Sequence, residues 1–149
     1  MQTIVSNDRN LIDFERLSAF IQASYWGKGR SRDTIRRSFD GSLCFVALQG
    51  GGGGEGSEDS EDGGELVGFA RVITDGAVLG YICDVIVFEE FRGQGISKQI
   101  MRAILDHPEL AGIEGFMLAT SDAQGLYEKF GFKPVGPDNN YMRLSLTER

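Results

Sequence analysis

The sequence has few of the residues that build redox and metal sites: two cysteines and one histidine in 149 residues. Cys44 and Cys83 each lie in an apolar, strand-like run. Neither has a second cysteine or a histidine at a metal-binding spacing, so we expect two buried free thiols and no metal site. His107 ends an amphipathic segment, where a cation or donor would cap a helix C-terminus, and we prefer this role to catalysis.

Long apolar runs and an excess of basic charge are also missing. No run is long enough to span a bilayer, and residues 1–5 lack the pattern of a signal peptide, so we expect no membrane contact and a cytoplasmic location. The formal charge is −7, and five of the acidic residues lie within 55–62, so the rest of the chain carries only −2. Neither the net charge of the whole chain nor that of the rest of the chain favours nucleic-acid binding.

Residues 50–64 contain only glycine, acidic residues and serine, with eight glycines among them. Such a tract has no side chain to bury, and we expect a disordered loop inside one domain that spans 1–149. A chain of this length buries roughly 70% of its unfolded surface, which is enough for a core. The tract is interpreted as a tolerated insertion in a hairpin, with an acidic docking segment for a basic partner as the alternative.

The rest of the chain alternates between helical and strand-like patterns. Asp8 or Asn10 could cap the first helix, Ser31 the second and Thr120 to Asp122 the last. The helix after the third long strand makes the next strand parallel to it, whereas Asp75-Gly76 predicts an antiparallel hairpin. We therefore expect an α/β (α+β) domain with helices over 11–26, 32–39, 96–105 and 123–130 and strands over 42–48, 65–74, 77–88, 115–119, 132–135 and 141–146.

The most informative stretch is a strand, a glycine turn and a helix start. An apolar strand ends at Phe88, a short acidic turn follows, and Arg92-Gly93-Gln94-Gly95-Ile96-Ser97 leads into an amphipathic helix. Free N–H groups at a helix start, with glycines that allow close approach, suit a phosphate. The glycine spacing fits neither the Rossmann fingerprint nor a P-loop. An ordinary tight turn is the alternative.

Two motifs together carry a resemblance to a known family. R-x-x-G-x-S, formed by Arg92, Gly95 and Ser97, resembles the pyrophosphate loop of the GNAT (GCN5-related) N-acetyltransferases, with Ser97 a mild departure. A-x-x-L-Y-x-x-x-G-F, from Ala123 to Phe132, resembles the second signature of that family. The resemblance covers residues 41–146 well and the first forty loosely.

The resemblance implies a GNAT acyl-CoA N-acyltransferase fold, with a mixed, mostly antiparallel central sheet flanked by helices. Acetyl-CoA would lie where the strands 77–88 and 115–119 splay apart. Its pyrophosphate would bind the glycine turn and its pantetheine the main chain of the preceding strand. The expected cofactor-binding residues are Val85, Ile86, Val87, Arg92, Gly93, Gln94, Gly95, Ile96 and Ser97. Tyr25 and Trp26 are expected to line the acceptor pocket, with packing of the helix end as an equal alternative.

The implied reaction is direct attack of a primary amine on the thioester. Tyr127 matches the tyrosine that protonates the leaving thiolate, although it could instead simply pack the helix. Asp84, a charge within an apolar strand, is the candidate base, with amine recognition or a structural salt bridge as alternatives. The acceptor would be a small-molecule or peptide amine, and its identity is left open. Whether the chain forms a homodimer is also left open. The competing hypothesis is a catalytically silent acyl-CoA-binding or protein-interaction module.

Overall fold

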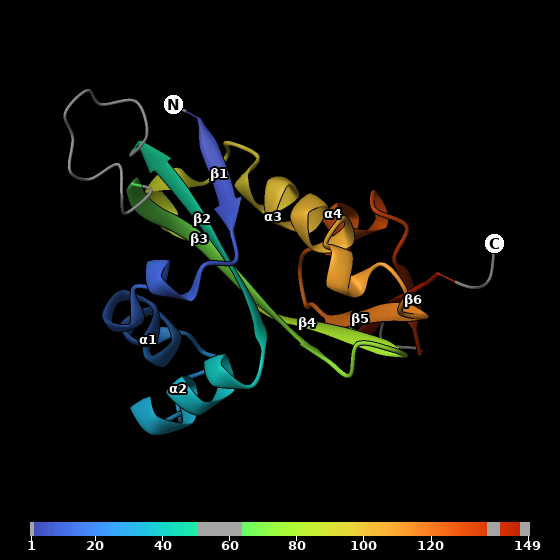
Figure 1. Cartoon of the computed structure of the whole chain (residues 1–149), viewed down its shortest axis with the longest axis horizontal. Coiled ribbons are helices and arrows are strands. Elements are labelled where there is room, and N and C mark those ends of the chain that lie inside the picture. Colours follow the sequence, from blue (N-terminus) through green and yellow to red (C-terminus); the bar gives the residue numbers. More distant parts are fainter. Residues whose placement is uncertain (1, 51–63, 137–140, 147–149) are drawn as a thin grey trace.

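The computed structural model describes residues 2–50, 64–136 and 141–146. Within these ranges, seven strands form one sheet in the order β1-β2-β3-β4-β5-β7-β6, with four α-helices around it (Figure 1). The strands are β1 (Thr3–Ser6), β2 (Leu43–Gly50), β3 (Gly64–Thr74), β4 (Leu79–Val87), β5 (Gly115–Ala119), β6 (Lys133–Val135) and β7 (Tyr141–Ser145). The helices are α1 (Phe14–Ala23), α2 (Arg32–Asp40), α3 (Ile96–Leu105) and α4 (Gln124–Glu128), and 3-10 turns lie at Arg9–Leu11, Glu89–Phe91 and Pro108–Leu110.

The sheet is mixed and mostly antiparallel, which confirms the predicted fold class. All neighbouring strands run antiparallel except β4 and β5, which are joined by the α3 crossover and run parallel. The short edge strand β1 was not predicted. It has only four residues and is held by its pairing with β2, from Thr3↔Gln49 to Ser6↔Val46, which is a contact that local sequence does not encode.

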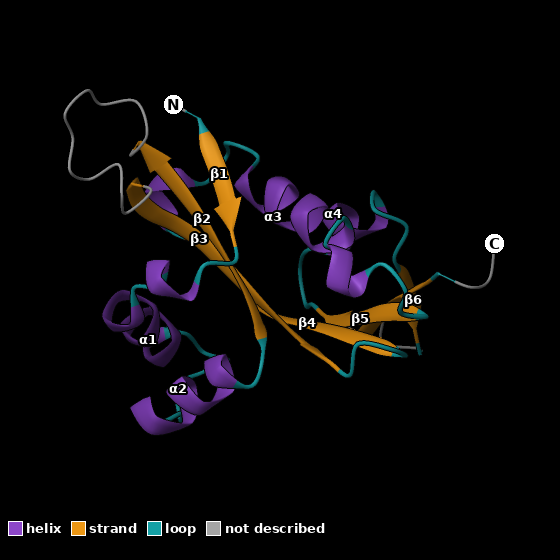
Figure 2. Ribbon diagram, in the orientation of Figure 1, coloured by secondary structure: helices purple, strands orange, loops and turns teal. Residues whose placement is uncertain are grey.

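The helices cover opposite faces of the sheet (Figure 2). Apolar residues of α3, including Ile96, Ile100 and Ile104, pack with Ile82 of β4 and Leu118 of β5 in one buried cluster. On the other face, α1 and α2 pack against the first half of the sheet, in a second cluster that contains Leu17, Ile21, Ile35, Phe39, Phe69 and Ile86. The two clusters together fix β4 in the middle of the molecule, where the candidate site lies.

A bulge reverses the direction of the side chains along β4. Asp84 and Val85 stand opposite the single residue Ala70, because Phe69 pairs with Ile86 while Arg71 pairs with Cys83. Asp84 has φ +53°, which is the left-handed conformation that aspartate tolerates better than most residues. As a result Ile82 faces α3 whereas Ile86, four residues later, faces α1 and α2. An unbroken strand would place both on one face.

Several expected element ends are corrected by hydrogen bonds. The first helix begins at Phe14 rather than at residue 11, because the Asp13 carboxylate accepts from Arg16 N–H and caps it, while Asp8 caps the preceding 3-10 turn. The last helix is shorter than 123–130, and Thr120 Oγ1 accepts from the Ala123 N–H at its start. The expected Ser31 cap of α2 is confirmed.

The expected role of His107 is wrong. Its Nδ1 accepts a hydrogen bond from the Glu109 N–H at 3.1 Å and so caps the next 3-10 turn instead of the carbonyls that end α3. Its ring also packs edge-on against Phe45, with centroids 5.6 Å apart. Because Nδ1 is an acceptor in this contact, it does not donate to the carbonyls of α3, and proline at residue 108 fixes the turn that the side chain caps.

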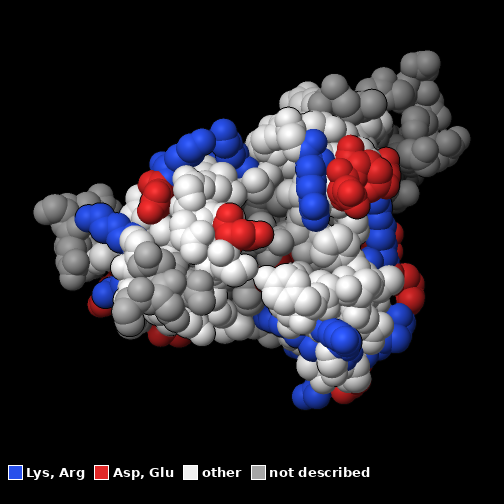
Figure 3. Space-filling model, turned by 180° about the vertical axis from the view of Figure 1, so that it is seen from behind, with Lys and Arg blue, Asp and Glu red and all other residues white. Residues whose placement is uncertain are grey.

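The expected disordered loop falls almost wholly on residues 51–63, which lie outside the described residues; β2 and β3 meet at its base through the pair Gly50↔Gly64. No helix of the described part has the length and apolar character needed to cross a membrane. On the face seen in Figure 3, acidic and basic side chains are interspersed.

Candidate active site

The site begins where two parallel strands separate. β4 and β5 pair only from Leu79↔Gly115 to Ile82↔Leu118, although β4 continues to Val87. A cavity of about 520 Å³ opens beyond the last pair. The bulge at Asp84 increases the local twist of β4 and turns the strand away from β5, so within the described residues its backbone on that side has no partner strand.

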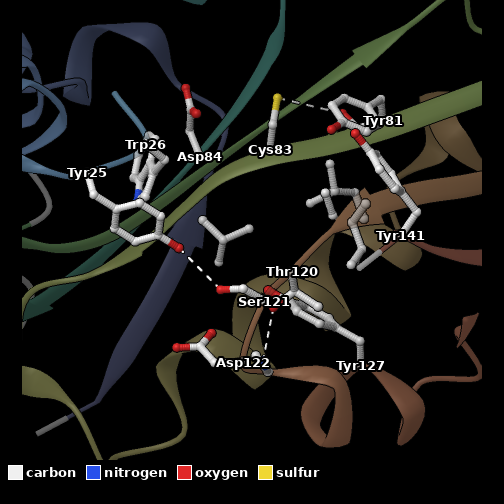
Figure 4. Close-up of a pocket in the computed structure, with 15 residues that line it drawn as sticks. Tyr25, Trp26, Tyr81, Cys83, Asp84, Thr120, Ser121, Asp122, Tyr127 and Tyr141 are labelled. Atoms are coloured by element: carbon white, nitrogen blue, oxygen red, sulfur yellow. Dashed lines mark hydrogen bonds between the residues drawn. The ribbon is translucent and has the colours of Figure 1, made fainter. Parts of the chain in front are cut away.

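The cavity is walled by several parts of the chain, and Tyr141 reaches it from β7 (Figure 4). β4 supplies one wall, the end of β5 with the loop into α4 supplies another, and the loop between α1 and α2 closes one end. The lining residues are Tyr25, Trp26, Tyr81, Ile82, Cys83, Asp84, Val85, Leu118, Ala119, Thr120, Ser121, Asp122, Ala123, Tyr127 and Tyr141. The fold therefore brings together Tyr25, Trp26, Asp84, Val85 and Tyr127, which the sequence analysis had named separately.

Tyr127 reaches the cavity from α4. It is only 7% exposed, and its ring packs edge-on against Phe132, with centroids 6.1 Å apart. Burial, with a smaller effect from the nearby Asp122 carboxylate, raises the pKa of its phenol above the usual value. The side chain therefore meets both demands placed on it: it packs α4 against the core, and it keeps a proton that it can donate.

Asp84 is held by two arginines. Arg71 Nε donates to Asp84 Oδ2 at 2.7 Å, and Arg30 Nη1 lies 3.1 Å from Oδ2 and 3.3 Å from Oδ1. Arg71 also donates from Nη1 to Ser42 Oγ at 2.9 Å. Both carboxylate oxygens are thus occupied, and the Asp84 side chain is 2% exposed. This geometry favours the structural salt bridge that the sequence analysis considered beside the role of a base.

The loop between α1 and α2 lies against the far wall of the cavity. Tyr25 is 81% exposed, and its hydroxyl is 3.2 Å from Ser121 Oγ in the loop before α4 (Figure 4). Trp26 packs beneath the Arg30 guanidinium, whose central carbon lies 5.5 Å from the ring centroid. The two aromatic side chains therefore border the cavity, and Arg30 connects their loop to Asp84 on β4.

The glycine turn lies beyond the end of β4, between the 3-10 turn at Glu89–Phe91 and α3, and it does not line the cavity. Gly93 and Gly95 have φ of +84° and +79°, and no atom lies within 4 Å of a Cβ built on either. Gly95 is the N-cap of α3 and provides no side-chain cap, so the first N–H groups of the helix, which have no acceptor within the helix, are left for another acceptor. Arg92 donates from Nε to the Val87 carbonyl at 3.1 Å, and Gln94 accepts from Gln49 at 2.8 Å.

The other expected cofactor residues differ in their surroundings. Val87 and Ser97 are half-buried, whereas Ile96 and Ile86 are buried in the clusters on opposite faces of the sheet. If these residues bind the cofactor, they do so with main-chain atoms. The family resemblance implies the same for β4.

A comparison with protein families matches residues 40–134 to the acetyltransferase (GNAT) domain. The chain belongs to the GNAT acetyltransferase family. The match contains both motifs, the cavity's two strands and all of α3 and α4. The family resemblance stated from the sequence is therefore confirmed.

Relatives agree with this membership. The uncharacterized N-acetyltransferase ycf52 of Porphyra purpurea is 32% identical over 129 residues, which are 86% of this chain and 68% of that protein. A crystal structure of a GNAT-family protein from Xanthomonas campestris pv. campestris is 37% identical, covers 91% of this chain and 87% of its own, and superposes with a TM-score of 0.78. At 15% identity, N-acetylglutamate synthase from Neisseria gonorrhoeae shares the fold alone, with a TM-score of 0.72 over 99% of this chain and 36% of its own; that structure contains coenzyme A and N-acetyl-glutamate.

The GNAT site of this chain includes side chains that the sequence analysis missed. Tyr81 and Tyr141 line the cavity, and Arg30 and Arg71 hold Asp84. The alternation of Tyr81 with buried Ile82, and of Tyr141 with Met142, could have shown that both tyrosines face away from α3. No local signal pairs Arg30 with a residue 54 positions away.

The cavity also contains Cys83, which is half-buried rather than buried as expected; Cys44 is buried, and both thiols are free. Burial raises the pKa of Cys83 to about 11, so the thiol stays protonated at neutral pH and is a poor nucleophile. Within the described ranges, no three His, Cys, Asp or Glu residues come together as a metal site would require.

Proposed function

We propose that this protein transfers an acetyl group from acetyl-CoA to a primary amine by direct attack. The observation that carries the proposal is the edge of β4 beyond Ile82, which pairs with β3 on one side but no longer with β5 on the other. This edge leads from the cavity with Tyr127 toward the start of α3, which has no side-chain cap. A pantetheine arm can pair with the free edge of a strand, much as a peptide adds to a sheet. The diphosphate would bind the exposed N–H groups at Gly93 and Gly95, where a Cβ would fill the space needed by its oxygens.

The cofactor would be held mainly by the main chain of Val85, Ile86 and Val87 and by the turn from Arg92 to Ser97. The guanidinium of Arg92, which is fixed through Nε, keeps its other N–H groups for a phosphate. When bound, acetyl-CoA supplies an activated thioester. The chain's own residues position it, stabilise charge on the carbonyl oxygen and handle the protons.

The reaction forms one bond and breaks one. The amine lone pair attacks the thioester carbonyl carbon, the C–S bond breaks, and the thiolate takes the Tyr127 hydroxyl proton. The nitrogen loses a proton to water, and the Tyr127 phenolate recovers one from water. The products are an N-acetylated amine and CoA with a free thiol, so atoms and charge balance.

A neutral amine is the costly requirement, about 5 kcal/mol at pH 7 for an amine with the pKa of lysine. Arg30 and Arg71 together carry one more charge than Asp84 neutralises. A net positive charge beside the acceptor end of the cavity favours the neutral amine over the ammonium. We therefore assign Asp84 to the positioning of these arginines and of the bulge, and we assign deprotonation to the solvent.

The test is amine-dependent thiol release from acetyl-CoA by the purified chain, with acetyl-CoA binding measured by calorimetry on the same preparation. We expect one site per chain and release of thiol only when a suitable amine is present. Binding of acetyl-CoA without release for any amine in a broad panel would instead support the silent acyl-CoA-binding module. Failure to bind acetyl-CoA would contradict the proposal itself.

Further expectations rest on the sequence. We expect the partner to be a small-molecule or peptide amine rather than nucleic acid or a membrane, and we expect a cytoplasmic location. The oligomeric state, monomer or homodimer, is open. Size-exclusion chromatography with light scattering decides between the two.

A further inference from the structure

One end of the cavity has a wall of aromatic side chains. Tyr25, Trp26, Tyr81 and Tyr141 line it, and three of these are more exposed than aromatic residues usually are, at 81%, 38% and 48% for Tyr25, Trp26 and Tyr141. Uncovered ring surface that gathers around one cavity marks a binding site rather than a packing defect.

These four rings lie on the face of the sheet opposite α3. Ile82 and Met142 are buried in the α3 cluster, so the neighbouring Tyr81 and Tyr141 point to the other side. Tyr25 and Trp26 come from the loop between α1 and α2, and Figure 4 shows them across the cavity from Tyr81 and Tyr141. Tyr127 reaches the cavity from α4, so a molecule between the rings and a thioester near Tyr127 would meet inside it.

The charges at this end select against a second cation. Among the described residues that line the cavity, none is Lys, Arg or His, and the carboxylates are Asp84 and Asp122. Asp84 is more than neutralised by Arg30 and Arg71, and the Arg30 guanidinium already lies over the Trp26 ring. Among the described residues, no ion pair is formed by Asp122, which is exposed at the rim. The described lining residues thus leave one carboxylate without an ion pair, which matches one ammonium.

Burial, followed by Cys83 and Tyr141, raises the pKa of Tyr81, so its ring carries a neutral hydroxyl at physiological pH. The wall therefore offers flat apolar faces with hydroxyls at their edges and no formal charge. Such a wall suits a planar aromatic group, which stacks or packs edge-on against tyrosine and tryptophan.

We propose that the acceptor is an arylalkylamine: one primary amine joined by a short chain to an uncharged aromatic ring. This rests on the proposed acetyl transfer and names its substrate class. The ring lies between Trp26 and the pair Tyr81 and Tyr141, and the ammonium enters past Asp122 before it loses its proton. A polyamine would bring a second cation toward the excess positive charge of Arg30 and Arg71.

The test compares three amines of similar reach: 2-phenylethylamine, 2-cyclohexylethylamine and 1,4-diaminobutane. Each is assayed for kcat/KM with saturating acetyl-CoA. We expect phenylethylamine to exceed cyclohexylethylamine by about 2–10-fold, the range that corresponds to aromatic pairing beyond area burial, and to exceed the diamine by about tenfold or more. The ratio is measured on the unaltered chain, so it does not depend on the folding of any variant.

Variants sharpen the assignment. Tyr141→Leu should reduce the preference for the phenyl over the cyclohexyl amine to less than about twofold, whereas Tyr141→Phe should keep it. Val78→Ser, an exposed change at the tip of the β3–β4 hairpin and outside the cavity, is the control that should leave all three rates unchanged.

The outcomes separate the two proposals. Equal rates for the phenyl and cyclohexyl amines, or a faster diamine, would overturn the arylalkylamine assignment while acetyl transfer stands. No thiol release with any amine would overturn both. An unchanged preference in folded Tyr141→Leu would remove Tyr141 from the acceptor wall and contradict the position proposed for the ring.

Discussion

The cofactor end of this site consists mainly of main-chain groups, whereas the acceptor end consists of side chains. Gly93 and Gly95 present backbone N–H groups and have no side chains to interfere. The acceptor end is made of side chains, the four rings together with the Arg30–Asp84–Arg71 cluster, which come from the loop between α1 and α2 and from three separate strands. A backbone site accepts the same ligand with many sequences, whereas a side-chain site changes its ligand with each substitution. Substitutions at the two ends should therefore have different effects.

The largest effect is expected for the buried ion cluster. Asp84→Asn keeps the shape and tolerates φ +53°, but it leaves the Arg71 guanidinium, whose side chain is 9% exposed, without its carboxylate. We expect the free energy of unfolding to fall by about 3–5 kcal/mol, measured by urea titration. Glu15→Gln, which breaks the exposed pair with Arg32, is the matched control and should give no measurable change. Equal effects of the two substitutions would show that the Asp84 cluster is not buried in solution.

Tyr127→Phe tests the chemistry between the two ends. Removal of one hydroxyl should lower turnover by roughly 10²-fold or more. Affinity for acetyl-CoA should change by less than about 1 kcal/mol, because the proposed cofactor contacts are main chain. Val78→Ser, an exposed change outside the cavity, serves as the control and should leave turnover unchanged. Full turnover per folded Tyr127→Phe molecule would leave the tyrosine with packing alone.

The pKa direction of Tyr127 gives this test a pH dependence. Because burial raises the phenol pKa, its proton is retained as pH rises past the ordinary value of 10.0. Any stability linked to this group is fully present below pH 10.0 and is lost as pH rises through the higher folded-state value. Tyr127-dependent turnover should be lost over the same alkaline range. Loss that begins near neutral pH would point to another group.

Gly95→Ala tests the cofactor end. No atom crowds the new Cβ, but φ +79° costs an alanine about 1–2 kcal/mol, so both stability and CoA affinity should fall. Gly125→Ala, within α4 and also uncrowded, has no positive φ and should not reduce either quantity. Calorimetry and thermal unfolding measure the two effects. Unchanged CoA affinity in Gly95→Ala would place the diphosphate elsewhere.

The alkylation rate of Cys83 is expected to show a smaller effect. This rate measures how far the cavity wall is buried. With a pKa of about 11, against the ordinary 9.0, its thiolate fraction at pH 8 is about a hundredfold lower than that of a free thiol. Alkylation followed by mass spectrometry should therefore be slow at pH 8 and should accelerate toward pH 11. Stability linked to this thiol should be present below pH 9.0 and lost between pH 9.0 and about 11. Rapid alkylation at pH 8 would mean an open, solvated wall.

The smallest effect concerns residues 51–63. Gly50 and Gly64 are already paired at their base, so a two-residue turn should close the hairpin with the melting temperature unchanged or slightly raised. Activity on small amines should persist. A large fall in melting temperature, or loss of activity, would assign these residues a role that their composition does not suggest.

The cofactor end could be anticipated because its signals are local. Gly93 and Gly95 precede an amphipathic stripe, and strand, turn and helix are adjacent in the chain. The same holds for the hairpin at Asp75-Gly76, where the Asp75 carboxylate accepts from three successive N–H groups. Short-range hydrogen bonds and periodicity decide these elements, and the sequence contains both partners within a few residues.

The acceptor end could be predicted only in part because its contacts are long-range. Tyr25 and Trp26 were proposed through family resemblance, but the link from Tyr25 to Ser121 spans 96 positions. Asp84 was noticed as a charge in an apolar strand, yet its partners depend on a bulge that turns the side chain toward Arg71. A register shift of one residue decides which face of the sheet a side chain occupies. No sequence motif in β4 predicts the bulge that causes this shift.

Hydrogen exchange with and without acetyl-CoA locates the cofactor on the chain. We expect new protection at Val85 to Val87 and at the first turn of α3, with little change in α2 and at the paired ends of β2 and β3. Gly95→Ala should reduce that protection at equal acetyl-CoA concentration. Protection absent from both β4 and the start of α3, or found mainly on the α1 and α2 side of the molecule, would contradict the placement of acetyl-CoA between β4 and β5.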